Sequence, residues 1–314
     1  MNTNLSQLID ISNESARYDE YVKEIFADKQ ILARILKYTL DEFSDVDIET
    51  IINNIDEPEV SRIRMEPGYT NNEKIKKLSE EDNIPFEGKV VFDIRFSVYC
   101  GEESIKILIN IEAQKTTNAS KLGYHLDNRI IYYLGRMISS QKEVEFSKSD
   151  YDNLKAVRSI WICMDAGDEE DSINRISFRQ ETLYGKEMTL SNIDKVQGVI
   201  IRLRSNEEAD KSKNLLIAML EELLRKEDIK KKKRKLSEEY GLKINTNTER
   251  RLEEMCNLSQ VLVDKGIEQG IEIGEITGKV CARYEDGMSI AEIAEKSNVS
   301  IEVVENILKE KGLL

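Results

Sequence analysis

Two neighbouring stretches of the chain alternate strictly between apolar and polar residues, which is the pattern of a half-buried β-strand. Residues 90–98 place Asp93, Arg95 and Ser97 between five apolar residues: Val90, Phe92, Ile94, Phe96 and Val98. Residues 105–114 alternate in the same way, with four isoleucines on one face and four residues on the other: Leu108, Asn110, Glu112 and Gln114. Residues 101–103 between them predict a hairpin turn, so we expect the polar side chains of both strands on one face of a sheet.

The rest of the first two thirds predicts helices and strands in alternation. Apolar residues at helical spacing indicate two helices within residues 14–54 and one over 122–141. The almost continuous apolar run Val157–Met164 predicts a buried central strand, and Val196–Leu203 resembles a fourth strand. Residues 56–88 hold all three prolines and predict a long loop. The order helix, strand, strand, helix, strand, strand is typical of an α/β fold.

The last third predicts only helices. Residues 206–277 are charged and helical, and Gly266, Gly270 and Gly274 recur every four residues within them. This repeat favours either close helix–helix contact in an oligomer or a flexible linker. Residues 278–314 have the outline of a helix-turn-helix, in which Gly287 ends one helix and serines cap the next two. The acidic last helix favours oligomerisation or partner binding over DNA reading. The predicted domains are 1–205, 206–277 and 278–314.

Composition narrows the possible functions. The 314 residues contain four scattered cysteines without a C-x-x-C pair and a single histidine, His125. Disulfides, a structural zinc site and His-dependent nuclease chemistry are therefore not expected. No run of eighteen apolar residues occurs, and the first residues lack the basic and apolar regions of a secretion signal. We expect a cytoplasmic protein that does not span a membrane.

Charge is distributed unevenly along the chain. The formal net charge is -14, which disfavours the simplest form of DNA binding because counterion release requires a basic face. The exception is the run of six cationic residues from Lys230 to Lys235. It is either a solvated linker or the basic tail of a helix, or else a strip that contacts phosphates, in which case Lys231 and Lys232 are candidate DNA contacts.

The two predicted strands carry a candidate metal site. Hydrolysis of a phosphodiester needs charge neutralisation and a hydroxide source, and bound Mg²⁺ supplies both. This ion prefers oxygen ligands and needs only one or two carboxylates. Asp93 and Glu112 lie on the same face of adjacent strands, the Ala113 carbonyl could supply another oxygen, and Gln114 lies two residues beyond Glu112. Taken alone this spacing is weak, because most acids on an amphipathic strand face solvent.

Linked motifs around these residues strengthen the hypothesis. They are E-G-x-x-x-x-D-I-R-F at 87–96, I-N-I-E-A-Q at 109–114, R-x-I-Y-Y at 129–133 and S-I-W-I-C at 159–163. In these blocks the chain resembles the bacterial recombination-promoting nuclease/putative transposase family, which belongs to the PD-(D/E)XK nuclease superfamily. The resemblance extends over roughly the whole chain and is densest over 80–164. It implies a restriction-endonuclease-like mixed sheet flanked by helices, here with an all-α C-terminal extension.

The resemblance also implies roles for individual residues. Asp93 and Glu112 would be the two acids, and Gln114 would take the position that is usually a lysine. Because Gln114 carries no charge, a cation could come from Arg95 or Arg129, while Lys115 should point to the opposite face. Further candidates are Glu87 as a metal or water ligand and Tyr124 as a DNA contact.

Two functions follow from these expectations. The first is a Mg²⁺- or Mn²⁺-dependent DNA endonuclease associated with recombination or mobile elements, acting as a homo-oligomer on DNA. The second is a catalytically weak descendant that serves as a binding or assembly protein, which the acidic charge and the neutral Gln114 favour.

Overall fold

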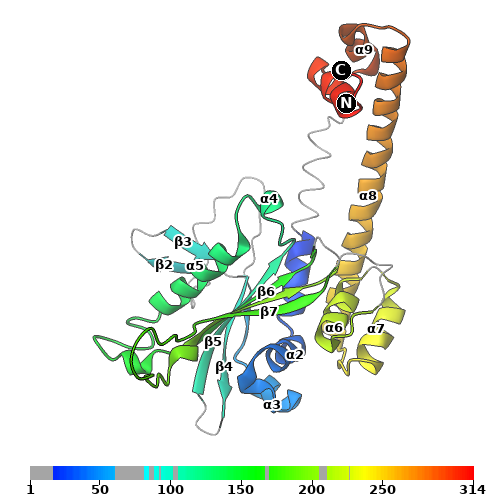
Figure 1. Ribbon diagram of the computed structural model, residues 1–314. Coiled ribbons are helices and arrows are strands. Elements are labelled where there is room, and N and C mark those ends of the chain that lie inside the picture. Colours follow the sequence, from blue (N-terminus) through cyan, green and yellow to red (C-terminus); the bar gives the residue numbers. More distant parts are fainter. Residues whose placement is uncertain are drawn as a thin grey trace. The chain divides into compact units, whose positions relative to one another are not determined.

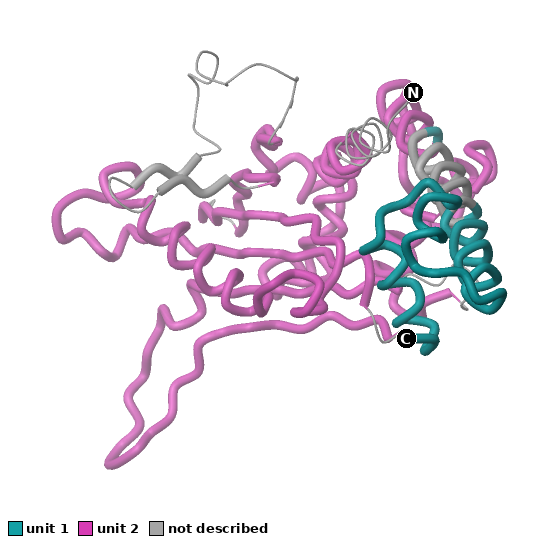
Figure 2. Tube along the Cα trace, turned by 90° about the horizontal axis from the view of Figure 1, so that it is seen from above, with its two compact units in different colours: residues 1–15, 257–314 teal, residues 16–256 magenta. Residues whose placement is uncertain are grey.

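The computed structural model describes residues 17–60, 81–84, 88–91, 93–101, 105–166, 170–204, 211–225 and 227–314, apart from the side chains of 81–84, 88–91, 258–270 and 272. Two compact units divide the chain: residues 16–256 form one, and residues 1–15 with 257–314 form the other (Figure 2). Within the described ranges, no helix combines the length and apolar character needed to cross a membrane.

A mixed six-stranded sheet lies at the centre of the larger unit (Figure 1). Its order is β1-β4-β5-β6-β8-β7, with β5, β6 and β8 parallel and the other pairs antiparallel. The strands are β1 (Glu59–Val60), β4 (Ile94–Cys100), β5 (Ile105–Gln114), β6 (Ala156–Cys163), β7 (Ser172–Ser177) and β8 (Val196–Arg202). A separate two-stranded sheet pairs β2 (Glu81–Ile84) with β3 (Gly88–Val91). The predicted α/β class with a mixed sheet is confirmed.

The predicted hairpin is the pair β4–β5. Gly101 follows β4 with a φ of +70°, a backbone conformation that favours glycine. The register pairs Ile94 with Ile111 and Val98 with Ile107, so the isoleucines of β5 share one face with the apolar residues of β4. The predicted first strand is interrupted, however: β3 ends at residue 91 and β4 begins at residue 94, so Asp93 precedes β4 instead of lying within it.

Helices cover both faces of the sheet. On the isoleucine face, the core includes helical residues 17–26, α2 (Lys29–Thr39), η1 (Asp41–Phe43), α3 (Ile48–Asn54), α6 (Leu215–Leu224) and α7 (Ile229–Glu238). On the other face, α5 (Leu126–Ser139) packs against Leu108, Val157 and Trp161. Short turns complete the unit: α4 (Ala119–Leu122), η2 (Tyr151–Asn153) and η3 (Ile193–Lys195). Both faces of β5 are therefore buried, and its polar residues do not face open solvent.

A glycine sets the distance between α5 and the sheet. A Cβ placed on Gly198 of β8 would lie 2.9 Å from Cγ2 of Ile130 on α5, which is closer than such atoms approach in proteins. The absence of a side chain at this position lets Ile130 rest directly on the strand. Arg129 is the residue before Ile130 in the same helix and therefore lies next to this contact.

Several strands have no counterpart in the sequence-based prediction. β1 and β2 fall in the stretch for which the sequence predicts a loop, and β7 lies between two predicted strands, whereas β3 overlaps the start of the predicted strand 90–98. The sequence of β7, SINRIS, is polar and largely exposed because this strand pairs with β8 on one side at the end of the sheet. An edge strand of this kind lacks the apolar alternation that identifies the other strands.

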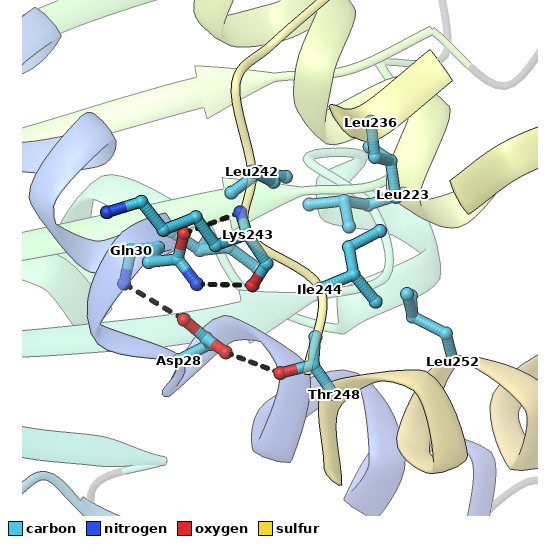
Figure 3. A pocket seen from close by; sticks show the side chains of 10 residues that line it. Asp28, Gln30, Leu223, Leu236, Leu242, Lys243, Ile244, Thr248 and Leu252 are labelled. Atoms are coloured by element: carbon cyan, nitrogen blue, oxygen red, sulfur yellow. Dashed lines mark hydrogen bonds between the residues drawn. The ribbon is translucent and has the colours of Figure 1, made fainter. Parts of the chain in front are cut away.

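The helices after the sheet belong to the same packing unit, contrary to the predicted boundary at residue 205. Leu216, Met219 and Leu220 of α6 and Leu236 of α7 are buried in the core on the isoleucine face. The start of α8 (Thr246–Glu285) is attached to α2 beside a small, mainly apolar pocket (Figure 3). The boundary between the units lies instead at residue 256, within α8.

The Gln30 side chain makes this attachment through two hydrogen bonds with the backbone of Lys243. Gln30 Nε2 donates to the Lys243 carbonyl over 2.9 Å, and the Lys243 N–H donates to Gln30 Oε1 over 2.8 Å (Figure 3). We expect Gln30→Ala to lower the free energy of unfolding by about 1–2 kcal/mol, because both backbone groups lose their partner. Urea unfolding measures this change. Lys243→Ala is the matched control, since it keeps both bonds; an equal loss in the control would contradict the prediction.

The C-terminal unit confirms the predicted helix-turn-helix outline. α8 ends at Glu285, and Gly287 takes a φ of +82°. Ser289 caps α9 (Ile290–Ser297) with a capping box, and Ser300 caps α10 (Ile301–Glu310). The three helices enclose a small core of five buried residues: Val280, Ile293, Ala294, Val304 and Leu308. The glycine repeat at 266–274 lies within α8.

Candidate metal centre

Two carboxylates meet where the β4–β5 ladder ends. The register that pairs Ile94 with Ile111 brings Asp93 opposite Glu112, one residue beyond the last pair. The Asp93 N–H donates to Glu112 Oε1 over 3.0 Å, and the Ala113 N–H donates to Asp93 Oδ2 over 3.0 Å. The two side chains thus replace ladder hydrogen bonds, which satisfies backbone donors and holds both carboxylates at the same end of the sheet.

Glu112 is almost completely buried. Only 2% of the residue is exposed, because α5 covers the face that the strand pattern alone left open. Burial raises the pKa of Glu112 to about 8, and the neighbouring charge of Asp93 contributes to the rise. Loss of solvation is thus the main reason why the ionised form of Glu112 is disfavoured. Strongly perturbed carboxyl pKa values cluster at functional sites, and structural ion-pair networks produce them as well.

Arg129, on the first turn of α5, approaches these residues from the other side. Its Nη2 lies 3.9 Å from Glu112 Oε2, and its Nη1 donates to Gln114 Oε1 over 3.3 Å. The guanidinium also donates to the hydroxyls of Tyr124 over 2.7 Å and Tyr133 over 2.9 Å. Gln114 and Arg129 therefore lie together, as the sequence hypothesis required, and two tyrosines hold the arginine in place.

A second cation comes from the N-terminal helical residues 17–26. Lys23 Nζ lies 2.6 Å from Asp93 Oδ1, and both side chains are about 15% exposed (15% and 16%). One turn earlier, Asp19 pairs with Lys115 over 3.7 Å, and burial raises the pKa of Asp19. Lys115 thus lies near helical residues 17–26, which pack on the isoleucine face, whereas Gln114 shares the Glu112 face. No sequence pattern indicates Lys23, because its position depends on how the helix packs against the sheet.

The oxygen donors are suitable for a hard divalent cation. Gln114 O accepts a bond from the N–H of Met164 on the β6 side, so the backbone of Ala113 faces the β4 side, where its N–H bonds Asp93. The two carboxylates and the Ala113 carbonyl offer the ligand type that Mg²⁺ prefers. Among the residues that the structure describes, no three His, Cys, Asp or Glu side chains form a metal-binding group, so Asp93 and Glu112 act here as a pair. Glu87 lies outside the described residues.

Other predicted contacts lie elsewhere. Arg95 is on β4 opposite Glu59 of β1, two residues from Asp93. Lys231 pairs with Glu227 over 2.5 Å. Lys232 is fully buried, with Nζ donating to the Leu223 carbonyl over 3.0 Å, and is therefore not available to a phosphate. The reason is helical periodicity: α7 turns positions 232 and 236 inward, so the six cations do not form one continuous strip.

Most of the remaining cations in the run also form ion pairs with carboxylates. Lys233 pairs with Glu249, Arg234 with Glu238, and Lys235 with Glu222 and Glu227. These ion pairs favour the basic part of a helix over a strip that contacts phosphates.

Comparison of the chain with protein-family models, with curated proteins and with solved structures finds no match. The candidate site is therefore defined by its own geometry: Asp93, Glu112, Gln114 and Arg129 were predicted, and Lys23 is added by the fold. These five residues come from helical residues 17–26, the start of β4, the end of β5 and the start of α5.

Proposed function

We propose that this chain is a metal-dependent nuclease that hydrolyses DNA phosphodiester bonds at the Asp93–Glu112 pair. The observation that carries the proposal is the pair of carboxylates at the end of the β4–β5 ladder, where Glu112 is buried and accepts the Asp93 N–H while Asp93 accepts the Ala113 N–H. These oxygen ligands suit a divalent cation, which would also stabilise the ionised form of Glu112 that burial disfavours. The resemblance of the surrounding motifs to a nuclease family supports the same conclusion.

The site residues fall into two groups: those that would bind the metal ion and those that would bind the phosphate. Asp93, Glu112 and the Ala113 carbonyl would hold Mg²⁺ or Mn²⁺, which when bound acts as a Lewis acid and lowers the pKa of coordinated water. Arg129 is positioned by Tyr124 and Tyr133 to bind a phosphate oxygen, and its planar guanidinium suits that role. Gln114, which accepts a bond from Arg129, orients the arginine through its amide oxygen.

Lys23 supplies the cation that position 114 lacks. Its ammonium group contacts Asp93 directly and lies in a partly buried environment, where a charge is screened less than at an open surface. It would stabilise negative charge that builds up on the phosphate during hydrolysis. Because Lys23 provides a positive charge, the neutral Gln114 on β5 is no longer an argument against cleavage.

A cleavage assay on the full chain tests the proposal. Supercoiled plasmid, single-stranded and branched DNA are incubated with Mg²⁺, with Mn²⁺ and with a chelator. We expect nicked or linear products only with metal. If no DNA is cut with either metal, or if cutting continues in the chelator, the proposal fails. Metal binding and self-association without cleavage would support the assembly-protein function instead.

Lys23→Ala is expected to lower the cleavage rate by about 10²-fold, the usual effect of removing one group that stabilises transition-state charge. Affinity for Mn²⁺ should stay the same or rise, because a cation that competes for Asp93 is removed. Single-turnover rates and calorimetric titration with Mn²⁺ measure the two effects separately. Lys23→Arg should retain part of the rate.

Lys115→Ala is the matched control for this experiment. Lys115 is 63% exposed and pairs with Asp19, so we expect cleavage close to the wild-type rate. An inactive Lys115→Ala variant beside a fully active Lys23→Ala variant would show that the cation had been assigned to the wrong lysine.

A further inference from the structure

The segment between β7 and η3 exposes an unusual number of apolar side chains. Residues 178–192, here called the arm, form neither helix nor strand, and Gly185 turns the chain with a φ of +81°. Five large apolar residues of the arm are exposed: Phe178 (65%), Leu183 (88%), Tyr184 (98%), Met188 (66%) and Leu190 (44%). Five exposed large apolar side chains within fifteen residues are uncommon on monomeric proteins, and concentrated apolar exposure marks surfaces that contact a partner.

The arm continues directly from an edge of the sheet. β7 forms the end of the strand order, and within the described sheet it pairs with β8 alone. Such an edge presents N–H and C=O groups that can pair with another strand. Its sequence, SINRIS, contains neither proline nor lysine, which proteins commonly use to protect an edge. Arg175, its only charged residue, is bonded to Asp41 and to the Thr39 carbonyl.

Charge identifies the kind of partner. The arm contains Arg179, Glu181, Lys186 and Glu187, so its formal net charge is zero in a chain whose net charge is -14. A neutral apolar surface does not match the polyanionic backbone of DNA, whose binding requires cationic contacts. It does match another copy of itself, because two strongly acidic chains repel each other least where each is locally neutral.

We propose that the arm and β7 form the interface with the same elements of a second copy of this chain. An identical edge strand can pair antiparallel with its copy about a two-fold axis, which makes the interface self-complementary. Phe178, Tyr184 and Met188 belong to the residue types that are enriched in the cores of interfaces. The pairing extends the six-stranded sheet across two chains and covers the apolar side chains of both arms. This inference does not depend on the proposed nuclease activity.

The oligomeric state of the full chain tests the proposal. We expect sedimentation equilibrium to give twice the mass of the chain at micromolar concentration. The double variant Leu183→Glu/Tyr184→Glu should weaken dimerisation by at least about 10²-fold, since it places like charges at a buried apolar contact. Both residues are nearly fully exposed within one chain, so the fold should persist, which circular dichroism verifies.

Val144→Glu/Tyr151→Glu is the matched control. These residues are also apolar and exposed, at 76% and 63%, but they lie outside the arm. This variant should dimerise like the wild type. Hydrogen exchange should in addition slow at β7 amides as the wild-type concentration rises. A wild-type chain that stays monomeric up to about 100 µM, well above the usual Kd of specific interfaces, overturns the proposal. Equal dimerisation of wild type and arm variant also overturns it.

Discussion

Asp93→Asn is expected to lower metal-dependent DNA cleavage by about 10³-fold or more, the largest effect on activity that the structure predicts. The substitution removes the negative charge that faces Lys23 and lies beside Glu112, while leaving a side chain of the same size. The amide oxygen of the variant can still accept the Ala113 N–H, the bond that attaches this residue to β5. Loss of activity can therefore be separated from loss of the fold.

The measurement compares cleavage rates of wild type and variant over a range of Mn²⁺ concentrations. A residual rate that does not recover at saturating metal would indicate that Asp93 acts in the reaction as well as in metal binding. Asp127→Asn is the matched control, because it removes the same charge from an exposed position in the first turn of α5. The assignment is untenable if Asp93→Asn and Asp127→Asn cut DNA equally well.

Glu112→Gln should stabilise the metal-free protein. The pKa of Glu112 is raised from 4.5 to about 8 in the folded state, so the folded protein retains a proton that the unfolded chain has lost. The stability associated with this proton is complete below pH 4.5 and is lost progressively as the pH rises towards 8. The amide introduced by Glu112→Gln does not titrate, so at pH 8 we expect the variant to be more stable by roughly 2–4 kcal/mol.

Chemical unfolding between pH 5 and pH 8 in the presence of a chelator measures this difference. The wild type should lose stability over that range more steeply than Glu112→Gln. Addition of Mn²⁺ at pH 8 should stabilise the wild type and leave the variant unchanged, because a metal that binds only the folded state shifts the equilibrium.

Glu222→Gln provides the control for burial without metal binding. The pKa of Glu222 is also raised by burial, but its partners are Lys235 and Glu227 on α7 and the preceding loop. Its stability should not respond to Mn²⁺. A wild-type protein whose stability is unaffected by metal at pH 8 would remove the main support for a cation at Glu112.

The central hairpin and the proximity of Asp93 and Glu112 could be predicted from the sequence because strand alternation acts locally. Ile107, Ile109 and Ile111 alternate with Asn110 and Glu112, and this parity alone places the acid on a known face. Similarly, local capping signals at Ser289 and Ser300 define the C-terminal helices correctly.

The remaining features depend on packing between distant segments. Lys23 reaches Asp93 only because its helix, far away along the chain, rests against the end of the sheet. Strand alternation by itself leaves Glu112 facing solvent, whereas the residue is buried because α5 covers it. The run of cations includes Lys232, but the turn of α7 places this residue in the core. A local sequence pattern predicts which face of a helix or strand is apolar. Which other element packs against that face depends on the tertiary structure, which the local pattern does not contain.

The contact between Gly198 and Ile130 implies that the position of Arg129 depends on a residue outside the candidate site. Gly198 lies on β8, two strands away from Glu112 on β5, and Ile130 adjoins the arginine on α5. Even the smallest side chain at position 198 would have to displace Ile130. A paired substitution, with a larger residue on the strand and a smaller one on the helix, would then shift the helix without altering any residue of the candidate site. The pair of residues at positions 198 and 130 would thereby set the position of Arg129.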